Sequence, residues 1–367
     1  MKFSVRREAI LGPLQFVASV VERRHTLPIL SNLLLRLQAD GLCLVGSDQE
    51  VELLANISDV EMLNEGAITV PARKLIDICR SLRPEATLDC ELVGDHLQVK
   101  SGRYRSQLGT LPAQDYPCIE IDENVAPLKI ASDVFGDSLA KTGFAMAQQD
   151  VRYFFNGMLL KLSSSRLTTV ATNGQRLATS VMDLPDLEEK SGEYIIPRKG
   201  VLELLKMIKT DGSELVVYFT TNHLQVVTDT GTVTTKLIDA TYPEFEAAIP
   251  GDNHNIVKVD RLDLKEALTR TAILSNETYR NIRLVVTGDN LQLEANNPNQ
   301  EEAEENITID YHGDDLDIGF NVEYLIDALS VMKSEEIVMA FSDAGSAALL
   351  TDPDDPDSRY VVSPMML

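Results

Sequence analysis

The chain repeats the same landmarks three times. Asn32, Asn156 and Asn281 each stand just before an apolar run, at intervals of 124 and 125 residues. Polar turns and helix-opening segments recur at nearly the same spacing: the turns are Ser47–Gln49, Thr172–Gly174 and Asn296–Pro298, and the openings are Val70–Ile76, Ile196–Leu202 and Phe320–Ile326. This period is too long for a solenoid repeat and suits a whole domain. We therefore expect three similar domains, residues 1–125, 126–254 and 255–367.

Each third divides again into two modules with the order β-α-β-β-β. In the first module, alternating Lys2–Val5 and a helical apolar stripe precede strand-like Leu33–Leu37, Leu42–Gly46 and Val51–Ile57. The predicted fold class is α+β with mostly antiparallel sheets and two helices per domain. The expected helices are Arg7–Val21, Pro71–Leu82, Ser132–Met146, Pro197–Ile208, Arg261–Leu274 and Val322–Met332. Ile121–Pro127 and Gly251–Asn255 are expected linkers, and Asp352–Asp357 an acidic surface loop.

The composition is that of a globular protein, with 44% apolar and 25% charged residues. No run of apolar residues is long enough to span a membrane, and the start lacks the apolar core of a signal peptide. We expect a cytoplasmic protein without a membrane partner. Its four cysteines, Cys43, Cys79, Cys90 and Cys118, form no Cys-x-x-Cys pair and are expected to be reduced core thiols.

The net charge of −24 is unevenly spread, because residues 255–367 carry 8 basic and 23 acidic side chains. An acidic protein is an unfavourable partner for phosphates, but a local basic face can persist inside it. All six expected helices have cations on or beside them. If two chains closed into a ring lined by twelve such helices, the opening would be about 25 Å wide, slightly more than a duplex of about 20 Å. Each helix could equally present an ordinary solvated face.

An enzyme and a protein scaffold that never meets DNA are the competing functions. His25, His96, His223, His254 and His312 are scattered without metal-ligand spacing, and no phosphate-binding glycine loop or nucleophile elbow is found. We therefore expect no catalytic residues, metal or cofactor. The net charge favours the scaffold, so the choice between scaffold and DNA-binding ring stays open on composition alone.

From end to end the chain resembles the bacterial DNA polymerase III beta subunit (sliding clamp) family. Matching segments include Thr26–Leu30, Val70–Lys74, Gln149–Tyr153, Ile196–Gly200, Ala272–Glu277, Glu301–Glu305 and Tyr360–Met365. The resemblance implies the DNA clamp fold and a head-to-tail homodimer. The six domains would form a ring, with helices inside and sheets outside. It implies a non-catalytic processivity factor, so that a nucleotidyltransferase label would belong to the holoenzyme.

The same resemblance names the partners. They are double-stranded DNA, the replicative polymerase alpha subunit, a separate ATP-driven clamp loader complex, and other DNA polymerases and repair proteins that carry clamp-binding motifs.

The resemblance places a peptide pocket between the second and third domains. A short apolar motif needs a preformed apolar slot with a few polar groups to orient its backbone. On the residues alone, the C-terminal run reads as a buried last strand in preference to a pocket wall. The implied pocket residues are Phe155, Thr172, Gly174, Gln175, Arg176, Leu177, Pro243, Ala248, Tyr279, Asn321, Tyr324, Val361, Val362, Ser363, Pro364, Met365 and Leu367.

A DNA-facing set and a dimer seam are also implied. The DNA set is Arg24, Arg73, Gln149, Tyr153, Phe154, Arg198 and Lys199, with contacts to phosphates and hence no sequence preference. Tyr153 and Phe154 could instead be core aromatics. In the seam, basic residues of the first domain face an acidic run of the third, which steers the head-to-tail contact. Its residues are Lys74, Arg103, Arg105, Leu108, Ile273, Leu274, Glu301, Glu302, Glu304 and Glu305; an ordinary solvated acidic loop is the alternative.

A few pocket positions depart from the family pattern. Gln175 stands where many relatives have histidine, Met366 where arginine is common, and Ala247 and Ala248 replace larger residues. These departures are expected to change the ranking of peptide partners.

Overall fold

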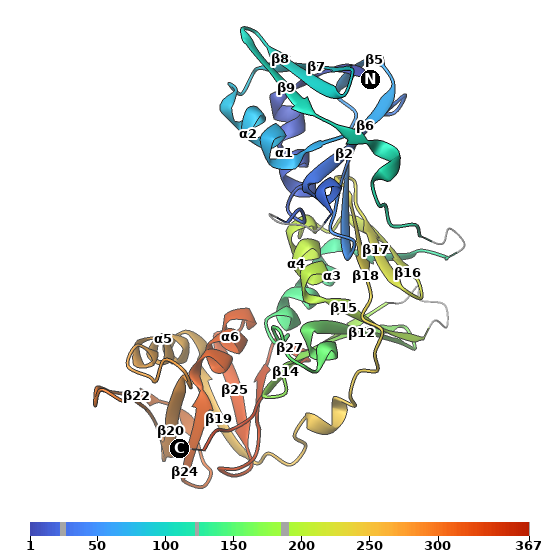
Figure 1. Cartoon of the computed structure of the whole chain (residues 1–367). Helices are drawn as coiled ribbons and strands as arrows, with labels where there is room; N and C mark the ends of the chain where they lie inside the picture. The colour runs from blue at the N-terminus through green and yellow to red at the C-terminus, as the bar shows by residue number, and fades with distance from the viewer. Residues whose placement is uncertain (23–26, 122–124, 185–190, 367) are drawn as a thin grey trace. The chain divides into compact units, whose positions relative to one another are not determined.

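The computed structural model describes residues 1–22, 27–121, 125–184 and 191–366. Within them lie six α-helices, one for each expected module (Figure 1). They are α1 Arg7–Val17, α2 Ala72–Ser81, α3 Ser132–Gly143, α4 Arg198–Met207, α5 Arg261–Ala272 and α6 Val322–Val331. The predicted module order is confirmed, as in β1-α1-β2-β3-β4 and β6-α2-β7-β8-β9. None of these helices combines the length and the apolar character that a membrane crossing needs.

The chain divides into two compact units. The first comprises residues 1–136 and 199–237, and the second residues 137–198 and 238–367. The expected central domain contributes to both units. The three domain boundaries predicted from the repeat therefore stay a prediction.

The first unit contains two antiparallel sheets. One has the order β5-β1-β7-β8-β9, made of Val60–Asn64, Lys2–Arg6, Thr87–Val93, His96–Ser101 and Tyr104–Gly109. The other has the order β10-β6-β2-β3-β4-β18-β17-β16-β11, made of Leu111–Pro112, Gly66–Pro71, Asn32–Gln38, Gly41–Ser47, Val51–Ile57, Thr232–Lys236, His223–Val227, Glu214–Phe219 and Leu128–Ala131. Helix α1 packs on β3 and β4 through buried Ile10, Leu14 and Val17. The β4–β18 pair makes this second sheet continuous.

The second unit also contains two antiparallel sheets. The larger has the order β15-β12-β13-β14-β27-β26-β25-β19-β23, made of Gly192–Pro197, Gly157–Ser163, Arg166–Thr172, Arg176–Asp183, Asp355–Val362, Ala348–Asp352, Glu336–Phe341, Asn255–Asp260 and Asp310–Tyr311. The smaller has the order β22-β21-β20-β24, made of Glu302–Thr308, Asn290–Asn296, Asn281–Thr287 and Leu316–Asn321. Helices α5 and α6 pack against each other in this unit.

Several helices end earlier than predicted. The largest difference is at α1, where the apolar stripe continues to Val21 but the helix ends at Val17. Ser19 and Val21 donate backbone N–H groups to oxygens three residues back, which is a turn geometry. Val20 is buried all the same, so the apolar pattern extends beyond the helix. Apolar residues that are buried after the end of a helix thus continue its apolar pattern, and the sequence then predicts a helix that is too long.

The predicted loop Asp352–Asp357 is wrong, because Asp352 ends β26 and Asp355 already begins β27, so that only residues 353 and 354 form the turn of a β26–β27 hairpin. Asp352 is buried and accepts hydrogen bonds from the backbone N–H of Lys333 (2.7 Å) and Ser334 (3.2 Å) and from the Ser334 hydroxyl. It therefore caps the chain just after α6. The predicted linker Gly251–Asn255 is also too long, since Asn255 is buried and begins β19.

Candidate functional site

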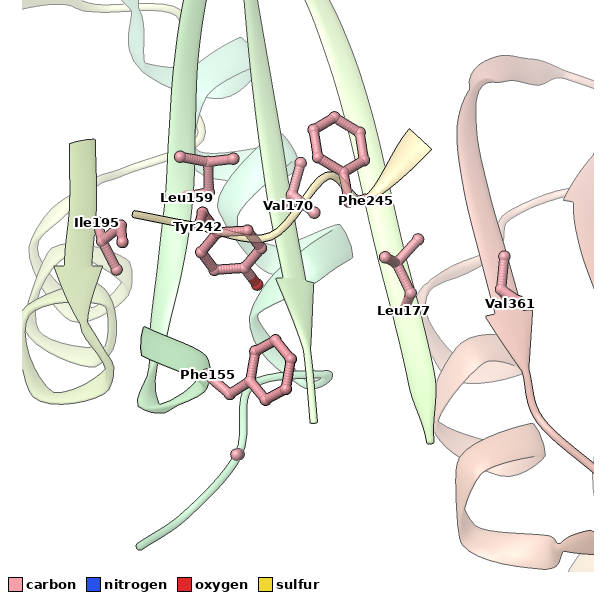
Figure 2. Close-up of a cluster of buried hydrophobic side chains, with 9 residues drawn as sticks. Phe155, Leu159, Val170, Leu177, Ile195, Tyr242, Phe245 and Val361 are labelled. Carbon is pink, nitrogen blue, oxygen red and sulfur yellow. The ribbon is translucent and has the colours of Figure 1, made fainter. Parts of the chain in front are cut away.

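A cluster of buried apolar side chains packs on strands of the larger sheet in the second unit (Figure 2). It draws on strands β12–β15, on β27 and on parts of the chain outside the sheet, which are Ala147, residues 153–156 and residues 238–249. Its aromatic rings meet edge to face, with Phe154 and Phe155 at 4.6 Å and Phe155 and Tyr242 at 6.1 Å between centroids. We call it the pocket cluster: Ala147, Phe155, Leu159, Val170, Leu177, Ile195, Tyr242, Phe245 and Val361.

Three residues predicted for the peptide pocket belong to this cluster, namely Phe155, Leu177 and Val361. Val361 lies opposite Leu177 in the β14–β27 ladder, and Val362 lies opposite Arg176. The C-terminal run is therefore a buried last strand, and that strand is also a wall of the predicted pocket.

Pro243 and Ala248 are exposed on the segment that carries Tyr242 and Phe245. Tyr242 and Phe245 themselves were missed by the sequence reasoning. The spacing Tyr-x-x-Phe after a strand was the available signal for them.

The turn between β13 and β14 holds the polar part of the predicted pocket. The Thr172 hydroxyl donates to the Arg176 carbonyl (2.6 Å) and accepts from the Gly174 N–H (3.0 Å). The Asn173 side chain accepts from the N–H groups of Gln175 and Arg176. Gly174 has φ +87°, where a side chain is strained, and a Cβ there would lie 2.9 Å from the Arg152 guanidinium. This turn is consequently fixed before any ligand arrives.

The Arg176 side chain connects three parts of the site. Its guanidinium contacts Asp327 at 2.5 Å, donates to the Phe144 carbonyl at 2.6 Å and lies 4.5 Å from the centroid of the Tyr324 ring. The sequence reasoning missed Phe144 and Asp327, for which the chain offers no local signal.

A cavity of about 470 Å³ opens beside Arg176, and Gln175, Tyr324, Arg152 and Arg198 also line it. Burial, together with the neighbouring charge of Arg176, lowers the pKa of Arg198. The cavity is thus a cationic one with an aromatic wall.

The C-terminal tail ties two parts of the site together. The Ser363 N–H donates to the Gln175 carbonyl, and the Met365 N–H donates to the Gly319 carbonyl, each at 2.8 Å. Pro364 lies between these two anchors, and Leu367 lies outside the described residues.

Tyr279 and Met365 line another cavity, of about 570 Å³. Asn321, by contrast, caps α6 by accepting from the Glu323 N–H at 3.0 Å.

The predicted DNA-facing residues differ in their surroundings. Arg73 is exposed on α2 and has no carboxylate within 4 Å among the described residues. Lys199 at the start of α4 instead contacts Asp48 and Glu22. Burial opposes its charged form, but the hydrogen bonds to these two carboxylates outweigh it and raise the Lys199 pKa. Arg24 lies outside the described residues.

In the second unit, Gln149 and Tyr153 are exposed, whereas Phe154 packs on the pocket cluster. Gln149 has φ +56°, an uncommon conformation for a non-glycine residue. Phe154 therefore has the core contact that was the alternative for it, and its DNA-facing role stays a prediction.

The predicted seam residues fall on two open sheet edges and the neighbouring helices. Strand β9 is the last strand of its sheet in the first unit, and β22 is the last strand of its sheet in the second. Arg103 and Arg105 are exposed at β9, as is Lys74 on α2; Glu301, Glu302 and Glu304 are exposed at β22, and Ile273 after α5 is 76% exposed. Edge strands with unpaired backbone groups are natural joining surfaces.

Two seam residues are engaged within the chain. Glu305 accepts from Arg270 at 2.6 Å and 3.1 Å, and this bond lowers the Glu305 pKa. Leu108 is buried and offers little surface to a partner. Leu274 is half-buried next to exposed Ile273.

The chain matches three family descriptions in order. These are the N-terminal domain of the DNA polymerase III beta subunit at residues 1–120, its central domain at 129–244 and its C-terminal domain at 246–366. The chain belongs to the DNA polymerase III beta subunit family. The DNA clamp fold expected from the sequence is thereby confirmed.

Relatives named beta sliding clamp match over the whole chain. The protein of Pseudomonas putida is 46% identical and that of Escherichia coli K12 40% identical, each with 100% of both chains covered. The crystal structure of the DNA polymerase III subunit beta from Pseudomonas aeruginosa is 45% identical, covers 100% of both chains and has a TM-score of 0.96. A second structure from that organism, with the same TM-score, is of the sliding clamp bound to griselimycin.

Proposed function

We propose that two copies of this chain form a closed sliding clamp around duplex DNA and act as a processivity factor. The observation that carries the proposal is the match to beta sliding clamps along the entire chain, in both sequence and fold. The clamp would work in the cytoplasm without chemistry of its own. It would hold the replicative polymerase and other motif-bearing proteins at the DNA after a loader had opened it. We keep residues 1–125, 126–254 and 255–367 as its proposed domains.

The proposed seam joins β9 of one copy to β22 of the other. Both strands are open edges, so their backbone groups can pair across the seam. The exposed cations Arg103 and Arg105 face a strand that carries exposed Glu302 and Glu304. Charges of opposite sign favour the head-to-tail pairing, and two like edges would repel. Ile273 adds an apolar contact beside this charged pair.

The proposed DNA contacts are to phosphates and are weak. Arg73 carries a charge that no described carboxylate neutralises, whereas Lys199 has to exchange Asp48 or Glu22 for a phosphate. Phosphate contacts carry no sequence information, which allows a ring to move along the duplex. The cationic cavity with Arg198 is a further place for a backbone phosphate.

The proposed peptide site combines the pocket cluster with the Thr172–Arg176 turn and the tail. Apolar side chains of a short motif would enter beside Leu177 and Val361, and the fixed turn would orient the motif's backbone. Gln175 lines the cavity beside Arg176, at a position where many relatives have histidine. This difference therefore changes a side chain that a bound peptide could contact.

A topology experiment tests the proposal. The labelled protein would be loaded onto nicked circular DNA with the clamp loader of a relative and ATP, then passed through a sizing column at high salt. A ring stays with the circle and is lost when the circle is cut, because nothing but topology retains it at a salt that dissolves phosphate contacts. Equal loss from circular and linear DNA would show that no ring encloses the DNA and would favour the scaffold.

A further inference from the structure

The pocket cluster contains a polar atom that the fold leaves without a partner. Tyr242 is 5% exposed, so it is more than nine-tenths buried. Within the described part of the chain, no group forms a hydrogen bond with its hydroxyl. Most buried polar atoms in folded proteins are hydrogen-bonded, because a polar group that has lost its water and gained no partner costs stability. The Tyr242 hydroxyl therefore needs a physical explanation.

This hydroxyl lies among apolar side chains, near Thr172 at the end of β13. The Tyr242 ring meets Phe155 edge to face, and its oxygen points to the side on which Phe155 lies (Figure 2). The backbone N–H of Thr172 is near enough to oppose the rise in the Tyr242 pKa that burial causes, but its geometry is not that of a hydrogen bond. The rise prevails, so the hydroxyl keeps its proton at neutral pH. It is a hydrogen-bond donor without an acceptor.

The segment that carries Tyr242 is held on both sides of this residue. Before it, the Ile238 N–H donates to the Ile195 carbonyl at 2.9 Å. After it, Glu246 accepts from the Lys161 ammonium group at 2.7 Å. These contacts fix the segment on the sheet, so the hydroxyl is held in place although no described group bonds to it.

The hydroxyl belongs to the part of the cluster in which a bound motif is expected. Thr172 pairs with Leu177 in the β13–β14 ladder, and Leu177 lies opposite Val361 in the β14–β27 ladder. The proposed site places the apolar side chains of a motif beside Leu177 and Val361. Each of these motif residues also carries a backbone carbonyl, which is an obligatory hydrogen-bond acceptor. Such a carbonyl is the acceptor that a bound motif would bring closest to the hydroxyl.

We propose that the Tyr242 hydroxyl donates a hydrogen bond to a backbone carbonyl of the peptide that occupies the pocket. The buried Phe155 ring turns aside as the peptide enters and gives the carbonyl access to the hydroxyl. This inference rests on the proposed function, and it makes Tyr242 a specificity-determining residue of the peptide site.

The consequence is a selection against wholly apolar ligands. A ligand that fills the pocket with carbon atoms alone leaves the hydroxyl unpaired, whereas a ligand with a well-placed carbonyl removes the cost of that unpaired group. Sites that are built to form a hydrogen bond discriminate strongly against analogues that cannot form it, because a buried group of the protein is then left without a partner. The pocket therefore recognises the backbone of the motif as well as its apolar side chains.

Tyr242→Phe tests the proposal in the full-length protein, because it removes the hydroxyl and keeps the ring. The affinity for a fluorescent clamp-motif peptide is measured by anisotropy, and the stability of the free protein by thermal unfolding. We expect the variant to bind the peptide roughly tenfold more weakly, which is the scale of one hydrogen bond to a buried group. The unfolding midpoint of the free protein should stay the same or rise, since the variant loses a buried unpaired polar group.

A chemically altered peptide shows whether the contact is direct. Each backbone carbonyl of the motif is replaced in turn by a thiocarbonyl, whose sulfur is a weaker acceptor. One replacement should weaken binding to the wild type and have a much smaller effect on Tyr242→Phe, because that variant already lacks the hydrogen bond. Tyr218→Phe on β16 of the first unit is the matched control, and it should leave the affinity for every peptide unchanged.

The outcomes separate the two proposals. If the unmodified peptide does not bind the wild type, the peptide pocket itself is refuted and the hydroxyl contact with it. If the peptide binds the wild type and Tyr242→Phe equally well, the hydroxyl contact alone is overturned. The contact is also overturned if no thiocarbonyl distinguishes the two proteins, or if free Tyr242→Phe unfolds at a lower temperature, which would show that the hydroxyl has a partner within the fold.

Discussion

The seam proposal makes a quantitative prediction at Ile273. This residue follows α5 and is 76% exposed in the chain, so almost its whole side chain is available to a partner. Burying a complete isoleucine side chain contributes about 1.5–3 kcal/mol. Truncation to alanine keeps the Cβ, and we therefore expect Ile273→Ala to cost about 1.5 kcal/mol at each seam.

The closed dimer has two such seams, so the cost doubles to about 3 kcal/mol. This corresponds to a rise of roughly a hundredfold in the dimer dissociation constant. Adding Leu274→Ala should increase the effect by less, because Leu274 is already half-buried within its own chain. The double variant is then expected to be mostly monomeric at concentrations where the wild type is a dimer.

Sedimentation velocity across a dilution series measures the dissociation constant directly. Ile256→Ala is the matched control, since Ile256 is 40% exposed on β19 in the same predicted domain but outside the proposed seam. It should leave the constant unchanged. If Ile273→Ala also leaves it unchanged while the chain stays folded, the assignment of this surface to the seam is wrong.

Three further predictions concern the tail, the hairpin and the DNA contacts. Removing residues 363–367, which follow β27, should abolish binding of a clamp-motif peptide in anisotropy while the dimer persists in sedimentation; retained affinity would refute the pocket. Burial alone would raise the pKa of Asp352, but its hydrogen bonds lower it. The Asp352 carboxylate therefore stabilises the fold fully above an ordinary aspartate pKa of about 4, and this stabilisation is lost as the pH falls through the lowered pKa. Asp352→Ala should lower the urea midpoint of unfolding at pH 7 by an amount equivalent to about 2–3 kcal/mol. Arg73→Ala should reduce the salt dependence of DNA binding by about one unit of slope, and Lys199→Ala by less, because Lys199 is already paired with Asp48; equal slopes would contradict this reasoning.

Much of the fold follows from local sequence signals. Strand β4 has the bounds predicted for it, and each helix begins within one residue of its predicted start. The repeat strengthens these predictions, because each module supplies an independent example of the same pattern. Strand β5 was missed, since Val60–Asn64 is an exposed edge strand without a buried face. Edge strands of this kind lack the alternation from which strands are recognised.

The strand partners could not be predicted in the same way. The pairs β4–β18 and β14–β27 join strands from distant parts of the chain. Periodicity shows that a strand has a buried face, but it does not show which edge lies beside it. The division into compact units depends on these pairs, and so the repeat alone could not reveal it.

The site shows the same limit at the level of single side chains. Leu177 and Val361 entered the predicted pocket through the resemblance, and the structure brings them together in one cluster. The partners of Arg176 come from α6 and from the residue after α3, which no local pattern connects to it. Ion-pair partners are set by tertiary packing, so residue type predicts the charge and not its neutralisation.

This local neutralisation bears on how the proposed clamp would hold DNA. Lys141, Lys206 and Lys333 on or beside the helices each contact a carboxylate of their own unit. A phosphate that approaches such a lysine has to replace an existing ion pair, so the gain in free energy is small. Because strong phosphate contacts are few, an open chain would bind linear DNA poorly. The same weakness lets a closed ring move along the DNA freely. We therefore infer that enclosure, and not affinity, accounts for retention, and that the acidic balance of the chain is compatible with a DNA-encircling function.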